Sequence, residues 1–195
     1  LCQGAATDIG LNPIPVTLEK EKTYYLQTSP EFAMKRLLAQ FQCPIFQICH
    51  AFRGAEHGRN HNPEFWMVEW YRPNWTYEAL MDETDQLMQT VAKTPPAQKI
   101  SYQNLFFEKL NIDPLTASDE QLVKLAEAHD YHDDSRSQLL DFLFSHLIEP
   151  DLGQQAPMIV YDYPAESASL AKVKEQENPV AMRFELYYKG LELAN

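Results

Sequence analysis

The sequence predicts an α+β fold in which an antiparallel β-sheet is flanked by helices. Strand-like runs dominate the first third of the chain, helical patterns fill its middle, and further strand-like runs follow. This order is typical of an antiparallel sheet with segregated helices rather than of alternating strands and helices. The length of 195 residues predicts one domain, residues 1–195, with a helical insert at about 95–155.

Composition and charge narrow the possible functions before any motif is considered. The formal net charge of −12 repels phosphate backbones, so we expect no nucleic-acid partner. No apolar run is long enough to cross a bilayer, so we expect no membrane association. The three cysteines form no C-x-x-C pair, which predicts reduced thiols and a cytoplasmic location.

The first elements expected are short strands followed by one helix. "TYYLQT" (23–28) has the β-branched and aromatic composition of a strand. "TSPEFAMKRLLAQF" has a helical pattern that begins in one of two ways. Thr28 and Glu31 could form a capping box, or Ser29 could cap the helix with Pro30 at its first position. Both alternatives place Glu31 in the first helical turn.

Residues 44–52 and 64–72 predict the two strands of a long antiparallel hairpin, joined by a polar, glycine-containing loop. Because side chains alternate between faces of a strand, every second residue shares a face. One face of the first strand is expected to carry Gln47, Cys49, Ala51 and Arg53, and one face of the second strand Phe65, Met67, Glu69 and Tyr71. The side chains of the first strand on this face are small, and the last of them is the cation of Arg53, so the face leaves room for a ligand.

The rest of the chain predicts four helices and then two extended segments. An amphipathic helix is expected over 76–93, and shorter helices near 101–110, 118–129 and 135–148. Two of them begin with capping-box patterns, Ser118 with Gln121 and Ser135 with Gln138. Residues 157–164 predict a strand, and residues 180–195 predict a short helix or strand that continues extended to the end.

The hairpin carries the residue types that a nucleotide and an amine require. Arg53 and His61 could hold phosphate groups through charge-assisted hydrogen bonds, and Phe65 could stack on a base. Glu69 and Tyr71 share the face of Phe65, and a carboxylate set among aromatic rings is costly to bury unless a ligand ammonium pairs with it. The alternative is a solvated loop beside core aromatics. The sequence contains no glycine-rich P-loop or dinucleotide-binding motif.

The pattern FR-x-x-E-x-GR-x-HNPEF-x-M-x-EWY, residues 52–71, closely resembles motif 2 of class II lysyl-tRNA synthetases. It is similar, more closely, to their paralogues without an anticodon-binding domain, the elongation factor P–(R)-β-lysine ligases. "TSPEFAMKRLL", "YPAESASLAKV" and "RFELYYKGLELAN" resemble neighbouring blocks of that family. The resemblance implies a partial class II synthetase-like catalytic domain. Motifs 1 and 3 of the family would lie outside the sequence, and full-length members would form homodimers.

The resemblance also implies a set of binding residues. ATP would be bound by Arg53, Ala55, Glu56, His61, Asn62, Phe65, Glu192, Leu193 and Asn195, with Arg53 as the catalytic residue and Glu192 as a ligand of Mg²⁺. The amino-acid substrate would be bound by Ser29, Glu31, Glu69 and Tyr71. Ala55 stands where many relatives carry an acid, so either Glu56 replaces that acid or one contact with ATP is lost.

The function that follows is an ATP-dependent ligase that adenylates (R)-β-lysine and transfers it to a lysine of elongation factor P. Ser29 favours this ligase, because the synthetases that the chain resembles usually carry alanine there. Two alternatives stay open. One is a lysyl-tRNA synthetase or another paralogue that adenylates an amino acid, and the other is a truncated, non-catalytic module that binds ATP or lysine.

Overall fold

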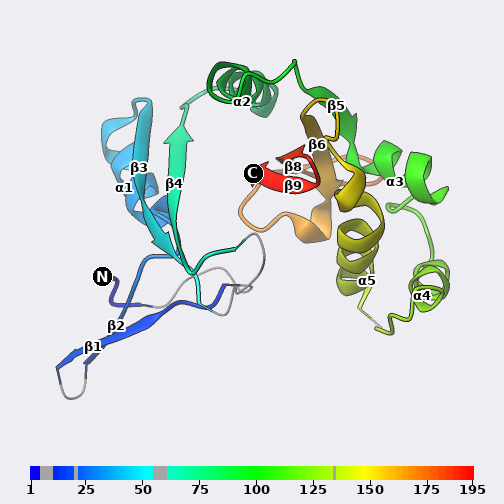
Figure 1. Ribbon diagram of the computed structural model, residues 1–195, viewed down its shortest axis with the longest axis horizontal. Coiled ribbons are helices and arrows are strands. Elements are labelled where there is room, and N and C mark those ends of the chain that lie inside the picture. The colour runs from blue at the N-terminus through cyan, green and yellow to red at the C-terminus, as the bar shows by residue number, and fades with distance from the viewer. Residues whose placement is uncertain (5–10, 20–21, 55–60, 134) are drawn as a thin grey trace. The chain divides into compact units, whose positions relative to one another are not determined.

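The structure, a computed structural model, describes residues 1–4, 11–19, 22–54, 61–133 and 135–195 (Figure 1). The chain forms two compact units, Leu1–Trp75 and Thr76–Asn195. Helices and mainly antiparallel strands occur in both, which confirms the predicted α+β class. The prediction that residues 1–195 are one domain stays a prediction.

The first unit contains two antiparallel hairpins and one helix. Its elements are β1 (Pro15–Glu19), β2 (Lys22–Tyr25), α1 (Glu31–Phe41), β3 (Ile45–Phe52) and β4 (Glu64–Tyr71). Strand β2 ends three residues before the predicted boundary at 28. The Leu26 N–H still donates to the carbonyl oxygen of Ile14 at 3.0 Å, so one backbone hydrogen bond continues the pairing just beyond the end of β2.

Helix α1 begins without the predicted capping box. Pro30 occupies the N-cap position and offers no side-chain acceptor, while Ser29 Oγ accepts a hydrogen bond from the Glu31 N–H at 3.2 Å. Thr28 is buried, and its carbonyl oxygen accepts from Arg53 Nε. The Thr28–Glu31 box is therefore wrong, and so is the Ser29 alternative, because Pro30 rather than Ser29 is the N-cap residue, although the Ser29 hydroxyl accepts from the Glu31 N–H. The place of Glu31 in the first turn is confirmed.

The predicted hairpin of β3 and β4 is confirmed, together with its faces. The antiparallel register pairs Gln47 with Glu69, Cys49 with Met67, and Ala51 with Phe65. The face that these residues share is called the site face below. The opposite face of the hairpin exposes large apolar side chains, those of Phe46, Ile48, Trp66 and Val68. Glu64 and His50 also lie on that opposite face, where they form an ion pair at 2.6 Å.

The second unit is built on a five-stranded sheet with helices on both faces (Figure 1). Its helices are α2 (Tyr77–Val91), α3 (Tyr102–Leu110), α4 (Asp119–Glu127) and α5 (Arg136–Leu143), which continues into a π-helical turn (Phe144–Ile148). Single 3₁₀ turns follow at Glu149–Asp151 and Ala165–Ser167. The strands are β5 (Gln98–Ser101), β6 (Met158–Pro164), β7 (Val173–Lys174), β8 (Val180–Tyr188) and β9 (Leu191–Ala194).

Alternation along β8 separates two hydrophobic clusters. Phe184 and Leu186 pack with Met81 of α2 on one face of the sheet. Ala181 and Tyr187 point to the other face, where they join the larger core formed by α3, α4 and α5. The predicted apolar stripe of α2 is thus confirmed at Met81, which is buried.

Two features of the second unit differ from the prediction. Strand β5 lies inside the predicted helical insert and pairs with β6 in parallel. The sequence did not predict this strand, because four residues are too few to show a period of two. The extended run predicted over 180–195 is a hairpin of β8 and β9. Lys189 and Gly190 both adopt positive φ, at 54° and 71°, which is the geometry of a two-residue type I′ turn. Lysine is not a typical residue of that turn, so the residue types alone do not predict it.

The two predicted capping boxes of the helical insert have different outcomes. At α4, Ser118 Oγ accepts from the Gln121 N–H at 3.3 Å, and Gln121 Oε1 accepts from the Ser118 N–H at 2.9 Å. The box is therefore confirmed there. At α5, Ser135 is the N-cap residue but forms no side-chain cap hydrogen bond, and its N–H donates instead to Asp133 Oδ1 at 2.7 Å. The Ser135–Gln138 box is therefore wrong.

We expect Ser118→Ala to lower the free energy of unfolding by about 1 kcal/mol, because it removes the acceptor for the Gln121 amide. Ser135→Ala is the matched control. It changes the same residue type at the same helix position, but no cap hydrogen bond is lost. Urea unfolding followed by circular dichroism measures both, and equal losses in the two variants would contradict the assignment.

Candidate functional site

The site face of the hairpin holds a half-buried carboxylate, Glu69, and the cost of its burial is only partly offset by neighbouring groups. Tyr71 OH donates a hydrogen bond to Glu69 Oε1 at 2.5 Å. Burial raises the pKa of Glu69, whereas the Tyr71 hydrogen bond lowers it. The Glu31 carboxylate raises this pKa further, and the cations of Lys35 and Arg53 lower it. A cationic ligand would lower the cost of keeping Glu69 ionised.

Helix α1 contributes a second carboxylate to the same neighbourhood. Glu31 lies in the first turn of the helix, and Lys35 follows one turn later. Lys35 Nζ forms an ion pair with Glu31 Oε1 at 2.5 Å. Because both charges affect the pKa of Glu69, α1 and β4 place two carboxylates and one ammonium within electrostatic reach of one another.

The other end of the site face combines a cation with an aromatic ring. The Arg53 guanidinium carbon lies 5.3 Å from the centroid of the Phe65 ring. Phe65 is half-buried on the same face of β4 as Glu69. A guanidinium is a good ligand for a phosphate, and an exposed ring face can stack on a base. Arg53 and Phe65 together therefore provide a cation for a phosphate and a ring for a base, as a nucleotide requires.

The remaining residues implied for ATP lie at different places. His61 and Asn62 are exposed just before β4, and Ala55 and Glu56 lie outside the described residues. In the second unit, Glu192 and Leu193 are exposed on β9. Asn195 Nδ2 donates to Glu192 Oε1 at 2.9 Å, so β9 positions these two polar side chains together.

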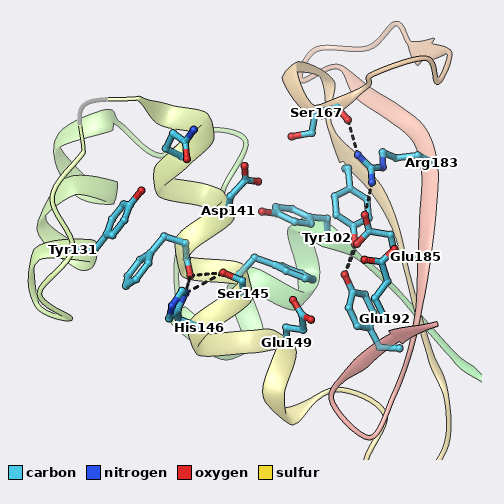
Figure 2. Close-up of a pocket in the computed structure, with 15 residues that line it drawn as sticks. Tyr102, Tyr131, Asp141, Ser145, His146, Glu149, Ser167, Arg183, Glu185 and Glu192 are labelled. Carbon is cyan, nitrogen blue, oxygen red and sulfur yellow. Dashed lines mark hydrogen bonds and ion pairs between the residues drawn. The ribbon is translucent and has the colours of Figure 1, made fainter. Parts of the chain in front are cut away.

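A pocket of about 430 Å³ lies within the second unit (Figure 2). Aromatic rings such as Tyr102 and acidic groups form its walls, with Asp141 on the helical side and Glu185 and Glu192 on the sheet side. Burial raises the pKa of the Asp141 carboxyl, and Glu185 raises it further, while Arg183 lowers it. The pocket is therefore acidic on both walls.

Glu185 is a residue of this pocket that the sequence interpretation missed. It is buried, and its carboxylate accepts hydrogen bonds from Tyr163 OH at 2.6 Å, from Tyr187 OH and from Arg183. Arg183 donates in addition to the Ser167 carbonyl at 2.9 Å. The available signal was the alternation of Arg183 and Glu185 with apolar residues along one strand, which places the two charged side chains on the same face of that strand.

The carboxylates of this pocket fit Mg²⁺ by their chemistry. Mg²⁺ prefers oxygen ligands and is usually held by one or two carboxylates together with substrate phosphates and water. Glu192 lines the pocket and is the candidate ligand, because Glu185 already accepts hydrogen bonds from Tyr163, Tyr187 and Arg183. No cluster of three or more metal-ligating side chains is found among the described residues, so a Mg²⁺ held here would take its further ligands from a bound phosphate group and water.

In the described part of the chain, no helix is both long and apolar enough to cross a membrane.

We expect Tyr71→Phe to raise the pKa of Glu69 above its value in the unchanged protein, because the hydroxyl donor that favours the ionised carboxylate is lost. A pH titration of the Glu69 side-chain ¹³C signal measures this. Tyr77→Phe removes a hydroxyl that donates to Asp162 in the second unit and is the control. An unchanged pKa in Tyr71→Phe would show that the hydrogen bond has no electrostatic role.

Comparison with known proteins agrees with these features. The family described as tRNA synthetases class II (D, K and N) matches residues 3–195. The elongation factor P–(R)-β-lysine ligase of Pasteurella multocida is 46% identical over 205 residues, which cover 100% of this chain and 63% of that protein. The ligase of the same name from Pseudoalteromonas translucida is 51% identical over 176 residues, which cover 88% of this chain and 54% of that protein.

A third relative of that name, from Haemophilus influenzae, is 48% identical over 180 residues, covering 91% of this chain and 56% of the relative. The chain therefore spans between 54% and 63% of the length of these curated relatives. The comparisons confirm the family that the motif of residues 52–71 predicts.

Proposed function

Because the chain belongs to the class II tRNA synthetase family (D, K and N), we propose that it is a catalytic portion of an ATP-dependent ligase for (R)-β-lysine. The observation that carries this proposal is the site face of the hairpin. It combines an amine-binding carboxylate, Glu69, with a phosphate-binding cation, Arg53, and a ring for the base, Phe65. Relatives named elongation factor P–(R)-β-lysine ligase support the same function.

The amino-acid substrate has two ammonium groups, and the first unit offers two carboxylates. Glu69 and Tyr71 bind the ε-ammonium, since the carboxylate lies half-buried and has one hydrogen-bond donor already in place. Glu31 binds the other amino group from the first turn of α1, beside Ser29. Charge-assisted hydrogen bonds of this kind contribute about 1.5–3 kcal/mol each.

The residues proposed for ATP come from the motif of residues 52–71 and, separately, from β9. Arg53 contacts the α-phosphate, Phe65 stacks on adenine, and His61 and Asn62 lie along the nucleotide. In the second unit, Glu192, Leu193 and Asn195 would contact the nucleotide, and Glu192 would hold Mg²⁺. When bound, Mg²⁺ neutralises phosphate charge. Ala55 and Glu56, beyond the described residues, complete the ATP set, and either Glu56 replaces the acid that Ala55 lacks or one contact with ATP is lost.

The reaction proceeds in two steps. The substrate carboxylate attacks the α-phosphorus in line, the bond to the β-phosphate oxygen breaks, and pyrophosphate leaves. Arg53 stabilises the negative charge that develops on the α-phosphate oxygens. The neutral amine of a lysine on elongation factor P then attacks the acyl carbon, loses a proton and releases AMP. The chain's own contribution is positioning and charge stabilisation.

The biological setting is part of the proposal. The partners are a lysine-like small molecule and elongation factor P, without a nucleic acid or a membrane. The complete protein is a homodimer in the cytoplasm. The free thiols of Cys2, Cys43 and Cys49 support a reducing compartment.

ATP–pyrophosphate exchange tests the function on the 195-residue chain and on the full-length gene product. We expect exchange that depends on (R)-β-lysine and is weaker with α-lysine. Preference for α-lysine would assign the protein to the synthetase alternative. Binding of nucleotide or lysine by calorimetry, with no exchange in the full-length product, would assign it to the non-catalytic alternative.

We expect Glu69→Gln to weaken binding of (R)-β-lysine at least tenfold, because a neutral amide loses the charge-assisted contact with the ε-ammonium. Binding of ATP should be unchanged. Glu64→Gln is the matched control, because Glu64 lies on the same strand but on the opposite face, where it pairs with His50. Calorimetry measures both ligands, and equal affinities of Glu69→Gln and Glu64→Gln for (R)-β-lysine would refute the role of Glu69.

Arg53→Ala should chiefly lower the rate of adenylation, by tenfold or more, which corresponds to about 1.4 kcal/mol or more in the barrier. The reason is that the guanidinium stabilises charge that is largest in the transition state. Single-turnover formation of the adenylate in the full-length product measures the rate. A rate within about threefold of that of the unchanged enzyme would exclude Arg53 from the chemical step.

A further inference from the structure

Lys35 is a charged residue in the amine-binding part of the first unit that the proposed function leaves without a role. Its ammonium lies 2.5 Å from Glu31 Oε1, the carboxylate that the proposed function gives to a substrate amino group. The same ammonium lowers the pKa of Glu69, the carboxylate given to the other substrate amino group. One cation of the protein therefore acts on both carboxylates that would receive the two ammonium groups of the substrate.

The ion pair of Lys35 and Glu31 is suited to being displaced. The two side chains are 42% and 31% exposed, and they are four residues apart on one helix. Exposed pairs of this spacing are weak, because water screens the charges and the long lysine side chain loses freedom when it is held. Moreover, a lysine side chain ends in the same primary ammonium group that a diamino acid carries. The lysine and the substrate thus compete for one acceptor by the same chemistry.

We propose that Lys35 is a specificity-determining residue whose ammonium occupies Glu31 until the substrate amino group displaces it. This inference rests on the proposed function, because it takes Glu31 and Glu69 as the two amine acceptors. It implies that Lys35 weakens binding of any ligand that places an ammonium on Glu31. A ligand that uses Glu69 alone does not compete with Lys35.

Two ligands separate these cases. (R)-β-lysine carries both amino groups, whereas 6-aminohexanoate has the same chain and carboxylate but lacks the amino group that Glu31 would receive. Replacing Lys35 by the uncharged, similarly long methionine removes the competitor. We expect Lys35→Met to bind (R)-β-lysine about two- to fivefold more tightly, the range that an exposed ion pair represents. Its affinity for 6-aminohexanoate should rise less, so the ratio of the two affinities increases.

The matched control is Arg36→Met, which removes the adjacent cation of α1. Arg36 is exposed on the same helix, and its loss changes the net charge by the same amount. This variant should leave the affinity ratio unchanged, so a general effect of charge is distinguished from competition at Glu31. Lys35→Arg, which keeps a cation at the position, should behave like the unchanged protein.

The pH dependence of binding gives a second readout that a purely structural role of Lys35 would not move. The charged and titratable neighbours of Glu69 are Glu31 and Lys35 on α1, Cys49 on β3, Arg53 and Tyr71. Because Lys35 lowers the pKa of Glu69, its removal raises that pKa. On acidification, Lys35→Met should therefore lose (R)-β-lysine binding at a higher pH than the unchanged protein. Arg36→Met should not.

The experiment is calorimetric titration of the full-length gene product and its variants with each ligand, at pH 8 and at a series of lower pH values. A raised affinity ratio in Lys35→Met with an unchanged ratio in Arg36→Met supports the inference. An unchanged or lowered ratio in Lys35→Met, while the unchanged protein binds (R)-β-lysine, overturns the inference and leaves the proposed function standing. If the unchanged protein binds neither ligand, the proposed function and the inference both fail. Should Lys35→Met not fold, Lys35→Gln carries the same expectations.

Discussion

The register of the β3–β4 hairpin is the constraint on which the candidate site depends. Side chains alternate with a period of two, so a slip of one residue would move Glu69, Tyr71 and Phe65 to the opposite face. The observed pairing of Gln47 with Glu69 and of Ala51 with Phe65 keeps them on one face. At about 3.3 Å per residue, the four residues from Phe65 to Glu69 span roughly 13 Å. The amine end and the nucleotide end of a ligand can therefore be bound by a single strand.

The two units use buried carboxylates in opposite ways. Glu185 of the second unit accepts from Tyr163, Tyr187 and Arg183, so its lone pairs are largely used by the protein. Such a carboxylate holds the pocket wall together. Glu69 of the first unit accepts from Tyr71 among the described residues, and burial still raises its pKa. Its spare acceptor capacity and its uncompensated desolvation are what a ligand ammonium would satisfy.

Local rules were the most reliable guide to the fold. The capping box of Ser118 and Gln121 needs four consecutive residues, and the structure forms it. The period of two in β3 and β4 is likewise local, and both faces were predicted correctly. The same local pattern failed at Ser135, because the neighbouring Asp133 carboxylate bonds the Ser135 amide instead. Whether a capping box forms thus depends on which acceptor lies nearest to the N–H of the N-cap residue.

The sequence by itself determined the family, the hairpin and the residue types of the site, because the motif over 52–71 is long and its alternation is fixed by strand geometry. Only the tertiary structure showed that the Lys35 charge acts on Glu69, and that Glu185 is buried and accepts a hydrogen bond from Tyr163. The tertiary structure also makes β5 a strand, because the backbone groups of its four residues pair with those of β6. These contacts join segments distant in sequence, and pairing between such segments leaves no local period for a sequence to display.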